Sequence, residues 1–266
     1  MTGEDHSFVV CAYGESRYLE ECVKSLLSQT VRSRIVIATS TPGEWISSLA
    51  EKYDICLTKN TVKKGIGSDW NFAFDSTATA LVTIAHQDDV YDMKYTEEML
   101  TYLNASRDPI LFFSDYKEIR NKHIAEAPKI LKIKRGMLFP LRVKAFRNSR
   151  FVRRRILSLG SPICCPSVTY VREKVGSSPF STSLKCDLDW DQWERLSRKK
   201  GAFVYCPKQL VLHRIHRESE TSKLIGDNTR TKEDIEILDR FWPKPIALLV
   251  ERFYKKSQDS NRENTE

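Results

Sequence analysis

The stretch LVTIAHQDDVYD, residues 81–92, joins an apolar run to three closely spaced carboxylates. A short, continuously apolar run is typical of a strand buried inside a parallel sheet. Asp88 and Asp89 follow it directly. Two adjacent acids repel each other and are costly to bury unless a cation or hydrogen-bond donors compensate them. The stretch therefore predicts a strand whose end faces a charged partner.

Apolar runs like this one recur along the first half of the chain and alternate with amphipathic helical patterns. We expect strands at 7–13, 34–40, 54–59, 81–87 and 110–119, and helices at 16–29, 43–53, 68–80 and 95–106. This alternation predicts an α/β fold with a mixed, mostly parallel sheet flanked by helices. Ligands of such sheets bind at the carboxyl ends of the strands. The turns that follow the strands are therefore the expected site.

The composition is that of a globular protein, with 41% hydrophobic residues in a chain of 266. No run approaches the roughly 18 to 20 apolar residues of a membrane span, and the first ten residues lack the features of a signal peptide. We therefore expect a cytoplasmic protein. Its seven cysteines are scattered and form no CxxC pair, so neither a zinc ribbon nor a disulfide framework is expected.

The net charge of +8 comes from one segment, because residues 127–172 hold twelve Lys or Arg and no acid. Near Lys129 the strand–helix alternation ends, and Pro140 is expected to open a helix. Apolar residues at spacings of three, four or seven would form one side of it: Leu138, Leu141, Ala145, Val152, Ile156 and Leu159. Residues 129–155 thus suit an anionic membrane surface, although a solvated basic face explains them too. Nucleic acid is not expected, since no nucleic-acid-binding motif is present.

Three clusters carry residues suited to catalysis or metal binding. Asp88 beside His86 suits Mg²⁺ or Mn²⁺, whereas Asp89 or Asp92 could instead cap a helix that begins near Met93. In DLDWDQWERL, residues 187–196, Asp189 is either a helix cap or a general base, and Asp187 and Asp191 compete for the second role. In HRIHRESET, residues 213–221, two His and two Arg suit a metal or phosphate oxygens, or form a solvated turn.

The order of these segments resembles glycosyltransferase family 2. The resemblance covers FVVCAYGESRYLEECVKSLLSQT (8–30), GIGSDWNFAFDSTATALVTIAHQDDVYD (65–92), GSPICCPSVTYVREKVG (160–176), LDWDQWERL (188–196) and LHRIHRESET (212–221). It implies a GT-A-like Rossmann-type fold and an inverting transfer of sugar from a nucleotide diphosphate, assisted by Mn²⁺ or Mg²⁺. The donor would be a UDP- or dTDP-sugar, and the acceptor a hydroxyl of a saccharide or lipid-linked molecule. Bacterial surface polysaccharide synthesis is the family's commonest setting.

The resemblance also implies roles for individual residues. Asp189 becomes the catalytic base. Asp88 and His216 become metal ligands, with His86 as a further candidate. The donor or nucleotide contacts become Tyr13, Glu15, Ser40, Asp69, Asn71, Asp89 and Arg214. Two departures stand out: His86 replaces the family's usual first acid, and ATSTP at 38–42 replaces an acidic pair.

We expect residues 1–120 to bind the nucleotide sugar and residues 121–221 to bind the acceptor and carry the catalytic residues. Residues 222–266 would form C-terminal helices, with a disordered tail from Lys255. Two rival functions remain, a metal-dependent nucleotidyltransferase and a non-catalytic protein that binds anionic surfaces or nucleic acid. The first usually has a basic, Gly-rich loop after its first strand, and CAYGESRYLEE (11–21) matches it poorly.

Overall fold

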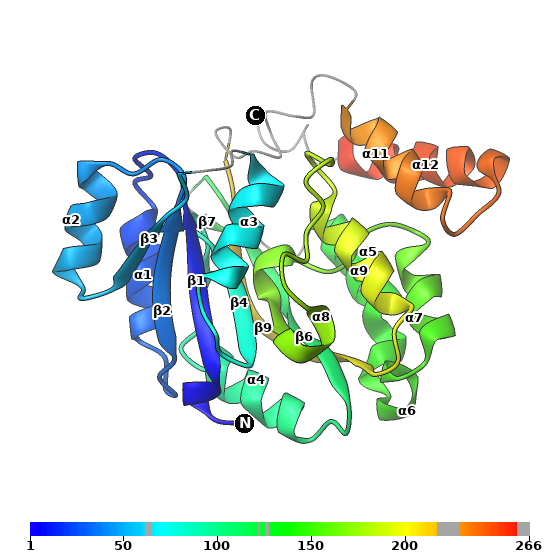
Figure 1. The fold of residues 1–266 in the computed structure, drawn as a ribbon. Coiled ribbons are helices and arrows are strands. Elements are labelled where there is room, and N and C mark those ends of the chain that lie inside the picture. Colours follow the sequence, from blue (N-terminus) through cyan, green and yellow to red (C-terminus); the bar gives the residue numbers. More distant parts are fainter. Residues whose placement is uncertain (62–64, 122, 126–127, 217–228, 260–266) are drawn as a thin grey trace.

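The computed structural model describes residues 1–61, 65–121, 123–125, 128–216 and 229–259 (Figure 1). Within these residues one sheet contains nine strands in the order β3-β2-β1-β4-β8-β6-β9-β5, and β7 pairs with β6. Their bounds are β1 (His6–Ala12), β2 (Arg34–Thr39), β3 (Cys56–Lys59), β4 (Leu81–His86), β5 (Val90–Tyr91), β6 (Pro109–Arg120), β7 (His123–Ile124), β8 (Val168–Val171) and β9 (Ala202–Ile215). The long strands β1, β2, β4, β6 and β9 run in one direction, and β8 lies antiparallel between β4 and β6. The predicted mixed, mostly parallel sheet is confirmed.

Helices cover both faces of this sheet (Figure 1). One face carries α1 (Leu19–Leu27), α2 (Glu44–Lys52) and α4 (Tyr95–Asn104). The other carries α3 (Ile66–Asp75), α7 (Arg150–Leu157), α9 (Leu188–Ser197), α11 (Thr229–Leu238) and α12 (Lys244–Asp259). Shorter connections contain α5 (Lys129–Leu138), α6 (Lys144–Arg147) and α8 (Arg172–Val175). None of the described helices is long and apolar enough to cross a membrane.

Strand β1 explains how the sheet separates two apolar cores. Phe8 and Val10 point to the face covered by α1 and α4, whereas Val9 points to the face covered by α3 and α9. All three are fully buried. Successive side chains of a strand point to opposite faces, so a strand covered on both sides must be apolar at every position. This is why the apolar runs of the sequence located the strands well.

The expected first-half elements are present, and several are shorter than predicted: α1, expected at 16–29, spans Leu19–Leu27. The helix expected at 68–80 ends at Asp75. The guanidinium of Arg172, nearly 100 residues away in sequence, donates to the carbonyl oxygens of Phe74, Thr77 and Thr79. These carbonyls bond the Arg172 side chain in place of backbone N–H groups of a further helical turn. The helix therefore ends, and the chain continues into β4.

The prediction of a single helix that begins at Pro140 is wrong. Helix α5 already begins at Lys129, and Pro140 lies in the first turn of a short 3₁₀ helix, Phe139–Arg142. Proline has no N–H to donate, so this tighter turn tolerates it where a continuing α-helix would not. Val143 is extended, and Ser149 then caps α7 by accepting a hydrogen bond from the Val152 N–H at 3.3 Å.

The two predicted C-terminal helices are present as α11 and α12. The tail expected to be disordered from Lys255 is helical as far as Asp259, so this part of the prediction is wrong. Residues 260–266 lie outside the described part of the chain. The apolar face of α12 joins the core through Ala247, which is why the helix extends past the predicted boundary.

Arg153 belongs to the basic segment, yet its side chain is only 1% exposed. Its guanidinium donates to the carbonyl oxygens of Ser197, Lys199 and Gly201, which end α9 and lead into β9, and it stacks on the ring of Phe203. A buried guanidinium needs such acceptors to offset its desolvation. One positive charge of the segment thus holds the end of α9 in place.

We expect Arg153→Met to lower the free energy of unfolding by about 3 kcal/mol or more, because three carbonyl groups lose their donor, two of them in the buried residues Ser197 and Gly201. Urea unfolding of the purified protein measures this change. The matched control is Arg150→Met on the same helix, whose exposed side chain should contribute little. Equal losses in the two variants would contradict the assigned role of Arg153.

Candidate functional site

The turn after β4 carries His86, Gln87, Asp88 and Asp89, and it lies beside the end of β1. Cys11 and His86 are paired across the two parallel strands. The Gln87 amide accepts from the Tyr13 N–H at 3.0 Å and donates to the Tyr13 carbonyl at 3.1 Å. The turns that end β1 and β4 are therefore held together, as expected for a site at the carboxyl edge of a sheet.

Asp89 is fully buried and joins this turn to β9. Its Oδ1 accepts from the Arg214 N–H at 2.8 Å and contacts Nδ1 of His213 at 3.0 Å. Burial alone would lower the pKa of His213, but the charge of Asp89 and its hydrogen bond raise it to about 9. His213 is thus a cation paired with the buried carboxylate. Neither Asp89 nor Asp92 caps α4, because Lys94 occupies the cap position; Asp92 Oδ1 accepts from the Lys94 N–H in the turn just before the helix.

Asp88 lies closer to solvent, with 20% of its side chain exposed. Its Oδ2 contacts Nε2 of His216 at 2.8 Å. Burial raises the pKa of Asp88, whereas this hydrogen bond and the nearby imidazoles lower it, and the net direction is downward. Burial lowers the pKa of His86. The turn therefore presents an ionised carboxylate next to a neutral imidazole at neutral pH.

The residues of this turn fit a divalent cation. Single ligand atoms of His86, Asp88 and Asp89 lie within 4.8 Å of one another. The Oδ2 atom of Asp89 is buried without a hydrogen bond from the described residues, and it lies 3.8 Å from Nδ1 of His86. A buried carboxylate oxygen needs a compensating partner, and Mn²⁺ and Mg²⁺ accept carboxylate oxygen ligands. Mn²⁺ also accepts the imidazole nitrogen that replaces the family's usual acid.

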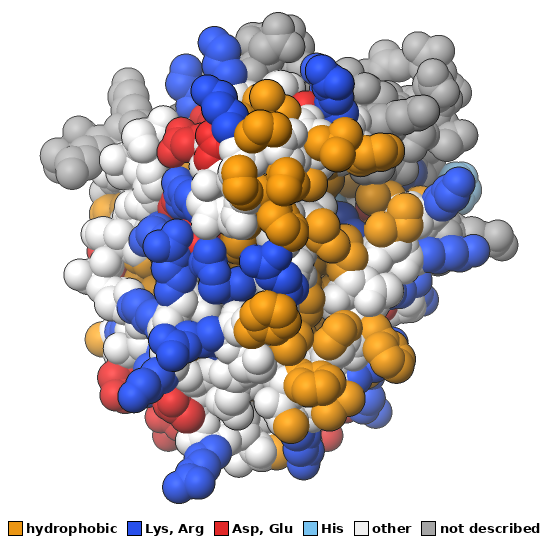
Figure 2. Space-filling model, turned by 90° about the vertical axis from the view of Figure 1, so that its right-hand side faces the viewer, with side chains coloured by type: hydrophobic (Ala, Val, Ile, Leu, Met, Phe, Trp, Pro, Cys, Tyr) orange, Lys and Arg blue, Asp and Glu red, His pale blue; other side chains and the backbone are white. Residues whose placement is uncertain are grey.

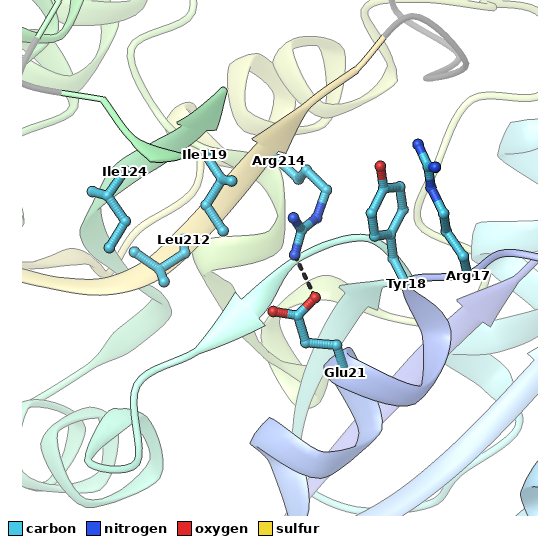
Figure 3. Close-up of a pocket in the computed structure, with 7 residues that line it drawn as sticks. All are labelled: Arg17, Tyr18, Glu21, Ile119, Ile124, Leu212 and Arg214. Atoms are coloured by element: carbon cyan, nitrogen blue, oxygen red, sulfur yellow. Dashed lines mark hydrogen bonds and ion pairs between the residues drawn. The ribbon is translucent and has the colours of Figure 1, made fainter. Parts of the chain in front are cut away.

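Arg214 lies between this turn and α1 (Figure 3). Its Nε donates to the Asp88 carbonyl oxygen at 2.9 Å, and its Nη2 pairs with Glu21 at 2.7 Å. The guanidinium also stacks on Tyr18, whose ring packs against His216. The pocket beside it has a volume of about 540 Å³ and is lined by Arg17, Tyr18, Glu21, Ile119, Ile124, Leu212 and Arg214. Arg214 thus fixes the acidic turn and presents positive charge at the pocket.

Two of the predicted nucleotide contacts meet at the ends of the neighbouring strands. The Ser40 hydroxyl donates to Oδ2 of Asp69 at 2.9 Å, and the Asn60 amide donates to Oδ1 at 3.1 Å. These residues follow β2 and β3 and lie on α3. Tyr13 and Glu15 are exposed in the turn after β1. The side chains of Tyr13, Glu15, Ser40 and Asp69 border the same edge of the sheet as Asp88.

The side chain of Asn71, the remaining predicted nucleotide contact on α3, bonds the backbone of Phe180 instead. Its amide donates to the Phe180 carbonyl at 2.8 Å and accepts from the Phe180 N–H at 2.7 Å. On the same helix, Gly67 lies against the Ser181 carbonyl so closely that a Cβ would overlap it. Trp70 contacts both Phe180 and His86. Helix α3 therefore joins the acidic turn to the loop that leads into α9.

Asp189 lies in the first turn of α9 and is the most accessible of the three acids there. Asp187, not Asp189, occupies the cap position, so the expected helix cap at Asp189 is wrong. Asp187 is buried next to Asp234, and burial raises its pKa. Asp191 pairs with Arg195 and Arg240. Burial raises the pKa of Asp189 to about 6, although the Trp190 N–H, Arg230 and Lys134 oppose the rise.

The loop before α9 is held by the C-terminal helix α11. The Glu233 carboxylate accepts from the N–H groups of Lys185, Cys186 and Asp187, at 2.8, 2.8 and 3.1 Å. Arg240, at the end of α11, bonds Asp191 at 2.6 Å. The position of Asp189 thus depends on a helix that begins 40 residues later in the sequence.

The charges of the acidic turn and of Asp189 act on the same buried residues, the Cys164–Cys165 pair. Burial raises the pKa of both thiols, and the charges of Asp89 and Asp189 each raise it further. Two acids that are 100 positions apart in the sequence thus influence one part of the core.

Sequence reasoning missed several residues of this site. Gln87, Trp70, Glu21 and Glu233 act through contacts made across the fold. The first three lie inside segments that carry the family resemblance, whereas Glu233 lies outside them. His213 was grouped with possible ligands, whereas it pairs with Asp89. Arg217 and the rest of the 217–221 stretch lie outside the described residues.

Comparisons with solved structures reveal similar folds in enzymes that bind nucleotide sugars. TarS 1–349 from S. aureus, in complex with UDP-GlcNAc, has 14% identity and a TM-score of 0.63 over 94% of this chain and 70% of that one. The mannosyltransferase PcManGT from Pyrobaculum calidifontis, with GDP-Man and Mn²⁺, has 14% identity and a TM-score of 0.63 over 96% and 75%. Glucosyl-3-phosphoglycerate synthase from Mycobacterium tuberculosis, with Mn²⁺ and UDP-glucose, has 15% identity and a TM-score of 0.55 over 90% and 79%.

The present chain spans 64% of one TarS 1–349 structure and 42% of a longer TarS structure. No curated protein sequence matches it. Residues 7–175 match the family described as glycosyl transferase family 2. The match includes the acidic turn after β4 and most of the sheet, so the chain belongs to glycosyl transferase family 2 and has the GT-A-like fold that its sequence predicts.

Proposed function

We propose that this protein is an inverting glycosyltransferase that moves a sugar from a nucleoside diphosphate to a hydroxyl of a saccharide or lipid-linked acceptor. The observation that carries the proposal is the pairing of an ionised Asp88 at the cation-suited turn with Asp189, whose pKa of about 6 suits a base. We assign the enzyme to bacterial surface polysaccharide synthesis at the cytoplasmic side of the membrane. A UDP- or dTDP-sugar is the donor.

The reaction is a single displacement. Asp189 takes the proton from the acceptor hydroxyl, and the oxygen attacks the anomeric carbon from the face opposite the nucleotide. The bond from that carbon to the diphosphate oxygen breaks, and the nucleoside diphosphate leaves with the electron pair. Arg214 and the charged His213 contribute positive potential on the leaving-group side. Ser40, Asp69, Tyr13 and Glu15 border the nucleotide, and Asn71 acts by fixing the Phe180 loop.

His86, Asp88 and Asp89 would hold Mn²⁺ or Mg²⁺, with His216 bound to Asp88 behind them. When bound, the cation supplies positive charge that stabilises the diphosphate. The protein's own part is to keep the ligand atoms in place. Asp89 does so through β9, and Arg214 does so through the Asp88 carbonyl.

Replacement of the base gives the first test. Asp189→Asn should lower the rate of sugar transfer by roughly a thousandfold, because amide nitrogen takes no proton from the acceptor. Donor affinity, measured by calorimetry, should stay near the wild-type value. Asp239→Asn, an exposed acid on the C-terminal side, is the control. An equal loss of donor binding and turnover in Asp189→Asn would exclude the base assignment.

The pH dependence gives a second test. The rate should rise with pH around a midpoint near 6, because Asp189 must be ionised to accept a proton and burial raises its pKa to about 6. Lys134→Met should move the midpoint upward, since the charge of Lys134 lowers the pKa of Asp189. Lys132→Met, an exposed position on the same helix, should leave it in place. An unchanged midpoint in Lys134→Met would contradict the assignment of Asp189 as the base.

Mn²⁺ binding, measured without turnover, tests the role of the acidic turn. Thermal stabilisation by Mn²⁺ with UDP should need at least about tenfold more Mn²⁺ in Asp88→Asn and in His86→Gln, because each loses a ligand atom. Asp92→Asn, which changes an acid of the same stretch that bonds the Lys94 N–H in the turn before α4, should match the wild type. Unchanged Mn²⁺ dependence in both variants would rule out the turn as the cation site.

Products separate the rival functions. Hydrolysis or transfer that releases a nucleoside diphosphate is expected here, whereas a nucleotidyltransferase would release pyrophosphate. A non-catalytic binding protein would give no product at all. Chromatography of the nucleotide products distinguishes the three.

A further inference from the structure

A shallow apolar groove lies on the helical side of the molecule, away from the acidic turn. It has a volume of about 400 Å³ and is lined by Met137, Pro140, Phe146, Phe151, Val152, Arg155, Ile156 and Leu159. Phe151 is 72% exposed and Phe139, beside the groove, is 60% exposed. Figure 2 shows the apolar side chains of this side of the molecule gathered in a band. Several large apolar groups exposed together mark a surface that meets a partner.

Lysine and arginine side chains border this band (Figure 2). The segment 127–172 that forms the groove contains no acid. Some of its cations are occupied inside the fold, since Arg135 pairs with Asp115 and Arg154 with Glu194. Lys129, Lys132, Arg142, Lys144 and Arg150 remain exposed. The surface therefore combines apolar side chains with positive charge.

Helix α12 continues the same surface. Its first residues lie beside the end of α7, where the Trp242 indole donates to the Ser158 carbonyl at 2.7 Å and Arg155 stacks on the Trp242 ring. Exposed apolar residues of α12 are Ile246, Leu248, Leu249 and Phe253. Lys244, Arg252 and Lys255 are exposed on the same helix. The pattern of apolar and basic residues thus extends across two segments of the chain.

We propose that α5, α6, α7 and α12 form a docking surface for an anionic lipid bilayer. Charge complementarity selects this partner. A symmetric dimer through the same surface would bring two acid-free basic segments face to face, since such contacts pair a patch with itself. Anionic lipid headgroups neutralise the rim, and the acyl region accepts the phenylalanines.

The position of the surface connects it to the reaction, and this step rests on the proposed function. The Trp190 indole, next to Asp189, donates to the Leu157 carbonyl at the end of α7 at 3.1 Å. Arg154 of α7 bonds Glu194 of α9. The docking surface and the catalytic base are therefore separated by a single helix layer. A lipid-linked acceptor in the bilayer would lie near the side of the protein that carries Asp189.

Co-sedimentation with vesicles tests the proposal on the full chain. We expect binding to phosphatidylglycerol-containing vesicles, much weaker binding to pure phosphatidylcholine, and a loss of binding at high salt. The triple variant Lys129→Gln/Lys144→Gln/Arg150→Gln should bind about a hundredfold more weakly, at roughly fivefold for each charge. Phe146→Ser/Phe151→Ser should bind the vesicles at least about tenfold more weakly, because its apolar contact with the acyl region is lost.

Matched controls lie on other sides of the molecule. Arg32→Gln/Arg34→Gln/Arg107→Gln removes three exposed cations, and Leu27→Ser/Met93→Ser removes two exposed apolar side chains. Both should bind vesicles as the wild type does. Equal losses in control and test variants, or no binding of the wild type to anionic vesicles, would overturn the proposal. So would a stable dimer in sedimentation velocity that Phe146→Ser/Phe151→Ser converts to monomer.

Donor hydrolysis in solution separates this proposal from the proposed function. The surface variants should hydrolyse the donor at the wild-type rate, since none of the changed residues lies in the catalytic site. Asp189→Asn should lose activity and still bind vesicles. Vesicle binding without any donor turnover by the wild type would support the surface and reject the glycosyltransferase mechanism.

Discussion

The buried carboxylate of Asp89 is the interaction on which the site depends. It is fully buried, and it joins the turn after β4 to β9 through the Arg214 N–H and the His213 imidazole. A buried charge is tolerated only when donors or a counter-ion surround it. Asp88 is adjacent in sequence, so its position follows from that of Asp89. The two acids thus differ in their surroundings: Asp89 is buried and fixes the turn, whereas Asp88 is partly exposed to solvent.

Helix α9, which carries Asp189, is held in a different way, by segments distant in sequence. Glu233 on α11 accepts hydrogen bonds from three backbone N–H groups ahead of α9, and Arg153 on α7 donates to three carbonyl oxygens behind it. Both ends of α9 are therefore held by side chains of opposite charge. Asp189 occupies the first turn of this helix, so its raised pKa depends on packing that the C-terminal helices help to create. The C-terminal helices are in this sense part of the site.

The sequence was informative where a local pattern determines the structure. The continuously apolar β1 and β4 located the sheet, and the order of motifs identified the family and the acidic turn. The sequence did not predict the features that depend on contacts between distant residues. Arg172 ends α3, Ala247 holds α12 in the core, and Arg153 is buried, and none of these is visible in residue spacing. The roles of the site residues remain predictions, although the fold brings Asp88, Ser40 and Asp69 to one edge of the sheet.

The basic segment shows why a charge count is an incomplete guide to a surface. Its twelve cations looked equivalent in the sequence. In the fold, Arg153 and Arg172 bond backbone carbonyls, and Arg135 and Arg154 pair with acids from β6 and α9. These four cations are bonded within the fold and contribute little to a distant partner. The exposed remainder lies beside exposed phenylalanines, and no acid within the segment offsets it. The same segment therefore contains two kinds of cation: the inner ones bond α9, β6 and the end of α3, and the outer ones form the proposed docking surface together with the apolar groove.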